Sequence, residues 1–190
     1  MPSATDYSII SIEDVKAALS IKSTDATQDN LLSDLIVNVS DATEVYLNRK
    51  VVARSVTSEK WDGDGGSVLM LPAPLVSITT LIDDTTTLTL TTDYIWYAKT
   101  GKVLRVSGIF TDGPQKITVT YRYGWEKDQI PGAIRLAVLK WVVHEWFALK
   151  KDRVGVASKS SGDETITYIV GIPSDVEGLL LPYRVTGFGA

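Results

Sequence analysis

The spacing of apolar residues changes twice along this chain, which limits the folds open to it. Between residues 31 and 46, apolar side chains recur every three or four positions, as on one face of a helix. From about Val52 the order becomes strand-like, and Leu88 and Leu90 alternate with threonines. Helical spacing returns after Pro131, and proline is a residue that the first turn of a helix tolerates. The pattern predicts an α+β fold with a β-rich segment enclosed by helices.

We predict four helices, over residues 11–20, 26–48, 131–151 and 173–181. Ser11 can cap the first helix. Glu13 and Asp14 place acidic groups in its first turn, where the helix dipole favours them. Asp25 and Gln28 have the spacing of a capping box for the second helix.

Between the second and third helices we expect an antiparallel unit of five or six strands over residues 52–123. The predicted organisation is a helical bundle from residues 1–50 and 124–190 with a β-rich insertion at 51–123, forming one integrated domain. Residues 154–163 are predicted to be a loop, and 165–170 a strand. The tail from Arg184 is expected to be mobile unless a partner orders it.

Composition excludes several classes of protein. An apolar content of 44% in 190 residues excludes disorder over the whole length. The absence of cysteine excludes disulfide scaffolds, thiolate metal sites and cysteine nucleophiles. A net charge of -4 disfavours tight non-specific DNA binding. We find no apolar run of membrane-spanning length and no secretory signal, so we expect no membrane partner.

The sequence offers little for catalysis or for metal and cofactor binding. The DxD pair Asp62 and Asp64 suggests calcium, but a calcium loop would need Gly and Glu where Ser67 and Ala73 stand, so we predict a tight turn. The single histidine, His144, would be the centre of any hydrolase, yet the chain has no GxSxG motif to supply a nucleophile. We therefore predict no enzyme, no cofactor and no metal site.

The five tryptophans leave a second function open. Trp61, Trp96 and Trp125 lie in or next to the β unit and could form a stacking face for carbohydrate or a cell surface, although core packing is the simpler role. Trp141 and Trp146 lie on the helix at 131–151, which is apolar around most of its circumference. Such a helix is buried in a core or between subunits, and these two tryptophans are candidate interface residues.

The order of segments is more specific than any one motif. SIEDVKAAL and DNLLSDLIVNVSDATEVYLNRK are followed by KWDGDGGSVLMLPAPLVSI, DYIWYAKTGKVL and ITVTYRYGWEKDQIPGAIRLAVLKWVVHEW, and the chain then closes on IPSDVEGLLLPYR. Over roughly residues 9–184 this resembles the head–tail connector, or adaptor, family of tailed bacteriophages, to which connectors of gene transfer agents are similar.

The resemblance implies a structural part of the virion neck. Members form a ring, commonly of twelve copies, that docks on the portal protein after DNA packaging. The ring extends the channel for double-stranded DNA without reading its sequence, and it presents a surface to stopper or tail-completion proteins. The implied location is the virion neck, with host cytoplasm as the place of assembly.

On this basis, the C-terminal apolar element is a candidate portal or subunit interface. Its residues are Ile172, Val176, Leu180, Tyr183 and Arg184. The alternative is that this element packs against its own bundle.

Overall fold

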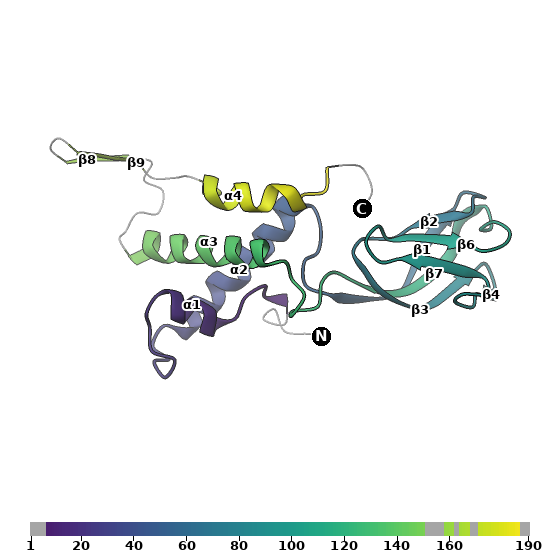
Figure 1. Cartoon of the computed structure of the whole chain (residues 1–190), viewed down its shortest axis with the longest axis horizontal. Coiled ribbons are helices and arrows are strands. Elements are labelled where there is room, and N and C mark those ends of the chain that lie inside the picture. Colours follow the sequence, from purple (N-terminus) through teal and green to yellow (C-terminus); the bar gives the residue numbers. More distant parts are fainter. Residues whose placement is uncertain (1–6, 151–157, 162–163, 168–170, 187–190) are drawn as a thin grey trace. The chain divides into compact units, whose positions relative to one another are not determined.

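The computed structural model describes residues 7–150, 158–161, 164–167 and 171–186. The chain forms two compact units, one from Met1–Asn48 with Ile130–Val185 and the other from Arg49–Gln129 with Thr186–Ala190. We call them the helical unit and the β unit (Figure 1). The fold is α+β and its β-rich region lies between the second and third helices, as predicted.

The elements follow the predicted order. They are α1 (Ile12–Ala18), α2 (Asp29–Leu47), β1 (Arg54–Gly63), β2 (Val68–Met70), β3 (Leu75–Asp83), β4 (Thr86–Thr87), β5 (Tyr94–Tyr97), β6 (Lys102–Arg105), β7 (Gly113–Tyr123), α3 (Gly132–Lys150), β8 (Ser158–Ser161), β9 (Glu164–Thr167), α4 (Ser174–Leu180) and the 3-10 turn η2 (Leu181–Tyr183). The four predicted helices are all present.

The start of α1 forms as the sequence predicts, whereas the start of α2 does not. Ser11 Oγ accepts a bond from the Asp14 N–H, and the Asp14 carboxylate accepts one from the Ser11 N–H, which completes a capping box. At α2 the cap position is Gln28, which makes no capping bond with its side chain. The Asp25 carboxylate instead accepts bonds from the N–H and hydroxyl of Thr27, so the capping box predicted there is wrong.

The Ser11 cap gives a first testable prediction. Ser11→Ala removes the acceptor of the 3.2 Å bond from Asp14 N, and we expect the helical unit to lose about 1 kcal/mol of unfolding free energy. Urea unfolding followed by circular dichroism measures this loss. Ser23→Ala, at an exposed position outside the helices, should change stability by less than about 0.5 kcal/mol. Equal midpoints for the two variants would contradict the capping role.

Apolar faces of all four helices meet in the core of the helical unit. Its most buried side chains include Val15, Leu32, Leu47, Ile134, Val138 and Leu180. The buried Lys16 on α1 forms an ion pair with Asp29 at 2.6 Å, which ties α1 to the first turn of α2. The second helix ends at Leu47, and Asn48 then adopts a left-handed conformation that asparagine tolerates better than most residues.

The β unit contains two antiparallel sheets, where we had predicted one unit of five or six strands. One sheet has the order β1-β7-β3-β4 and the other has the order β2-β6-β5. The hydrophobic core draws on both, with Leu81, Ile117 and Val119 from the first and Leu69 and Val103 from the second. The two sheets therefore pack face to face around one core.

The threonine-rich run departs from its predicted strand. β3 ends at Asp83, Thr86–Thr87 form β4, and Leu90 makes a single bridge to Tyr94, so the period of two at 87–91 does not build a longer strand. The Asp93 carboxylate accepts a bond from Thr89 N–H, and Asp93 N–H donates to the Thr89 carbonyl. Asp84 and Thr91 also have positive φ angles. These local bonds and turns compete with sheet pairing.

The last predicted loop and strand are also partly revised. Ser158–Ser161 forms β8 and pairs with β9, so the predicted loop at 154–163 is wrong for those four residues. β9 matches the first three residues of the strand predicted at 165–170. The rest of the strand prediction, residues 168–170, lies outside the described residues, as do 154–157 and 162–163 of the loop. The prediction that both units form one integrated domain stays a prediction.

Candidate interaction surfaces

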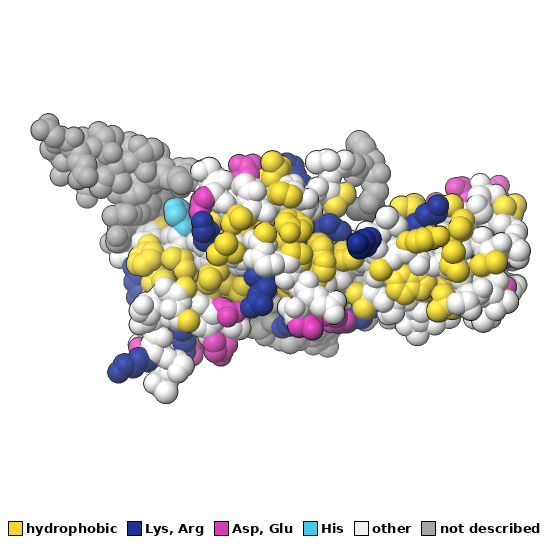
Figure 2. Space-filling view, viewed as in Figure 1, with side chains coloured by type: hydrophobic (Ala, Val, Ile, Leu, Met, Phe, Trp, Pro, Cys, Tyr) yellow, Lys and Arg dark blue, Asp and Glu magenta, His cyan; other side chains and the backbone are white. Residues whose placement is uncertain are grey.

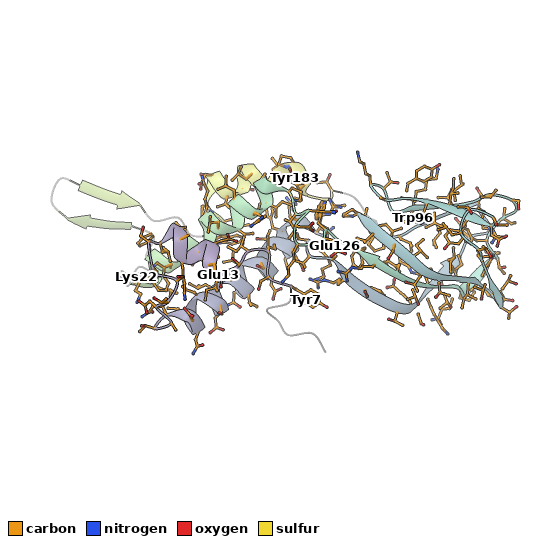
Figure 3. The ribbon with its side chains drawn as sticks, turned by 60° about the horizontal axis from the view of Figure 1, so that its bottom comes forward. Tyr7, Glu13, Lys22, Trp96, Glu126 and Tyr183 are labelled. Atoms are coloured by element: carbon orange, nitrogen blue, oxygen red, sulfur yellow. The ribbon has the colours of Figure 1, made fainter. Side chains whose placement is uncertain are left out.

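The C-terminal element that we selected from the sequence lies against its own helical unit. Val176 and Leu180 are buried on α4, with 1% and 0% of their surface exposed. Ile172 and Tyr183 are half-buried, and Arg184 is exposed. Tyr183 lies beyond the C-terminal end of α4 (Figure 3). Of these five residues, therefore, only Ile172, Tyr183 and Arg184 offer surface to a partner without rearrangement.

Polar contacts hold this element to α2 and α3. Lys140 donates to Asp175 Oδ2 at 2.7 Å, and this bond lowers the pKa of Asp175. The Tyr46 hydroxyl donates to Glu177 Oε1 at 3.1 Å. Burial and this bond both raise the pKa of Tyr46. α4 is thus fastened to α3 through Asp175 and to α2 through Glu177.

The chain segment after α4 is also held. The Arg184 guanidinium lies 5.0 Å from the centre of the Tyr46 ring, and Val185 N–H donates to the Leu47 carbonyl at 3.0 Å. The first residues of the tail are therefore ordered by α2, and residues 187–190 lie outside the described residues.

The two interface candidates on α3 belong to the core. Trp141 and Trp146 are buried, and the Trp141 indole N–H donates to Glu145 Oε1 at 3.2 Å. The opposite side of α3 carries exposed apolar side chains, Leu136 at 45% and Phe147 at 48%. Figure 2 shows hydrophobic side chains gathered over the part of the helical unit where Figure 1 places α3 and α4. The apolar circumference of α3 is therefore divided between core and surface.

A second apolar surface lies on the three-stranded sheet of the β unit. The strand register places Met70, Lys102 and Tyr97 in one row, and Val68, Leu104 and Ile95 in the next. Alternate residues Leu69, Val103 and Trp96 point to the core side, so these two rows point away from it. Met70 and Tyr97 are about half exposed, and the other four are half-buried. We call these six residues the outer sheet face.

The outer sheet face was missed in the sequence, although a signal for it exists. An antiparallel sheet with one solvated face alternates apolar and polar residues. The segments VLM and YIWY are apolar at both odd and even positions instead, as is the pair Val103 and Leu104. Such strands are apolar on both faces, and this favours the burial of both faces against other parts of the chain or against a partner. Figure 2 shows hydrophobic side chains, with basic ones beside them, where Figure 1 labels β2 and β6.

The three tryptophans of the carbohydrate hypothesis are engaged within the β unit. Trp61 and Trp96 pack against its core (Trp96 is labelled in Figure 3), and the Trp61 N–H donates to Glu59 Oε2 at 3.0 Å. The Arg49 guanidinium covers the Trp125 ring, 4.7 Å from its centre. Part of each ring is therefore covered by its own unit.

The residues considered for catalysis and for calcium binding, His144 and the pair Asp62 and Asp64, make contacts typical of structural residues. Glu145 Oε1 lies 3.9 Å from His144 Nδ1, and in the described ranges no hydroxyl bonds to His144. Asp64 Oδ1 accepts a bond from Gly66 N–H, as expected for the predicted turn. In the part of the chain that the structure describes, no cluster of three metal-ligating side chains occurs and no helix is long and apolar enough to cross a membrane.

The fold is thus α+β, with apolar surface exposed on α3 and on the outer sheet face. The family model for head completion protein matches residues 8–186, nearly the whole chain. The chain belongs to the head completion protein family.

Solved structures share the fold. A chain of the "neck of empty GTA particle computed with C6 symmetry" has a TM-score of 0.60 and 13% identity, covering 100% of this chain and 96% of that one. A chain of the "virion of native gene transfer agent (GTA) particle" has a TM-score of 0.59 and 14% identity, with the same coverage. A chain of the "neck of native GTA particle computed with C12 symmetry" has a TM-score of 0.57 and 14% identity, covering 96% of this chain and 97% of that one. No curated protein sequence matches this chain.

Proposed function

We propose that this protein is a structural adaptor of the virion neck, which forms a ring on the portal protein after DNA has been packaged. The observation that carries the proposal is the match to the head completion family over residues 8–186. The shared fold with chains from gene transfer agent necks supports it. The ring would hold twelve copies, extend the DNA channel and offer an attachment surface to stopper or tail-completion proteins.

The surface chemistry of the chain supports this role. A ring subunit contacts two neighbours through different faces, and the chain has apolar surface both on α3 and on the outer sheet face. A net charge of -4 suits a channel in which double-stranded DNA slides without sequence-specific binding, because a strongly basic wall would retain phosphates. The role needs no catalytic centre, so we propose that the protein is not an enzyme.

For the portal contact we propose the exposed part of the C-terminal element. Ile172, Tyr183 and Arg184 keep accessible surface there, and the neighbouring Leu181 is 56% exposed. The buried Val176 and Leu180, together with Trp141 and Trp146, would support this surface from within the helical unit.

Genetic complementation tests the function. Particles assembled without this protein should contain portals but lack joined tails, and supplying the chain in trans should restore infectious or transducing particles. A Leu181→Asp, Arg184→Glu chain should fold yet fail to restore them. Normal tail joining in the complete absence of the chain would contradict the proposed function.

A further inference from the structure

The outer sheet face combines apolar groups with one unpaired cation. Lys102 lies between Met70 and Tyr97 in its row, and no described carboxylate pairs with its ammonium group. With strands about 4.8 Å apart and three or four residues long, the face measures roughly 10 Å by 10 Å. An apolar area with a central cation fits a partner surface that offers apolar groups around a carboxylate.

The helical unit carries a surface with the complementary chemistry. Residues Leu31, Asp34, Asn38, Asp41 and Val45 are spaced by three or four and share the outward side of α2. We call them the α2 stripe. Val45 is 81% exposed, and Asp34 and Asp41 are exposed with no cation paired to them among the described residues. α2 contains no basic residue, so the charged side chains of the α2 stripe are all acidic.

We propose that the outer sheet face of one copy binds the α2 stripe of the next copy in the ring, with Lys102 paired to Asp41 or Asp34. The two surfaces differ, so the contact is head-to-tail, as ring growth requires, whereas a contact between identical faces would stop at a dimer. The inference rests on the proposed function, since that supplies the ring. The face is smaller than the roughly 800 Å² that each partner of a stable interface buries, so it forms the centre of a larger contact.

Charge reversal tests the pairing. Lys102→Glu places a carboxylate opposite the α2 stripe, and we expect the yield of rings, or of collars on the portal, to fall at least about tenfold. Lys60→Glu makes the same charge change on an exposed position of β1, outside this face, and should leave the yield unchanged. Combining Lys102→Glu with Asp34→Lys and Asp41→Lys should restore assembly.

Cysteine pairing tests proximity directly, because the native chain has no cysteine. A Tyr97→Cys chain mixed with a Val45→Cys chain should form a mixed disulfide dimer under mild oxidation when assembled. Each single variant assembled alone should form little disulfide, since identical positions would lie far apart in a head-to-tail contact. This readout holds even if a charge variant fails to fold.

The outcomes separate the contact from the function. Wild-type rings that tolerate Lys102→Glu and give no mixed disulfide would overturn the contact and leave the adaptor role intact. Lost assembly without restoration by the aspartate substitutions, and without the disulfide, would mean that another partner covers the face. Wild-type chains that form neither rings nor portal collars would overturn the proposed function, and the contact with it.

Discussion

Gly101→Ala is expected to unfold the β unit. Gly101 has a φ of +69°, and a Cβ there would lie 2.0 Å from the backbone oxygen of Leu71, a contact that no side-chain rotation relieves. Leu71 N–H also donates to the Gly101 carbonyl at 2.9 Å, so the two segments are held together. Strain from the positive φ adds to the clash, and we expect a loss of at least about 3 kcal/mol. Thermal and urea unfolding measure it.

A second glycine provides the matched control for this variant. Gly178 lies within α4 without a positive φ, and a Cβ built there meets nothing within 4 Å. Gly178→Ala should therefore stabilise the helical unit, by up to about 1 kcal/mol, because alanine favours the helix. If Gly101→Ala unfolded at the same denaturant concentration as the wild type, the close approach of Gly101 to Leu71 would be contradicted.

Trp141→Ala should destabilise the helical unit by about 3–5 kcal/mol, the usual cost of removing a large aromatic side chain from a core. Trp141 is 8% exposed and its N–H bonds to Glu145, so the substitution opens a cavity and leaves one acceptor without its donor. Chemical unfolding followed by helical circular dichroism gives the value.

The comparison with Leu136→Ala decides between a core and a docking role for this tryptophan. Leu136 is on the same helix and is 45% exposed, so its truncation should cost less than about 0.5 kcal/mol. A Trp141→Ala chain as stable as the wild type, yet unable to assemble, would contradict the core assignment and return Trp141 to the interface.

Local signals explain why the helices could be predicted from the sequence. In α2 the apolar period runs through residues 31–46, and the helix ends at Leu47, one residue before the predicted end at 48. Ser11 and Asp14 complete a capping box within four residues, so no distant contact is needed to fix the start of α1. Asp25 shows the limit of this argument, because one side chain can bond to either of two nearby groups and spacing alone does not choose between them.

Strand pairing could not be predicted in the same way. The choice between one sheet and two depends on contacts such as Leu69 with Val103, which are more than thirty positions apart. Apolar content also does not reveal which side of α3 or α4 is covered. Burial of Val176 and Leu180 within their own unit, and exposure of Met70 and Tyr97 on the outer sheet face, emerge only from the folded chain.

The proposed surfaces separate two kinds of contact, one with the portal and one with neighbouring copies. The C-terminal element of the helical unit, with Leu181 and Arg184 outward, is proposed for the portal. The outer sheet face and the α2 stripe are proposed for neighbouring copies. Leu181→Asp with Arg184→Glu tests the portal contact, and Lys102→Glu tests the contact between copies, so each contact can be removed without the other.

Assembly on the portal is the most direct test of the adaptor role. The purified chain of 20.7 kDa should be examined by mass measurement and negative-stain electron microscopy, alone and mixed with its cognate portal. The account predicts rings, or a collar of twelve copies on one end of the portal. A chain that remains a monomer, with no portal binding at any salt concentration, would contradict it.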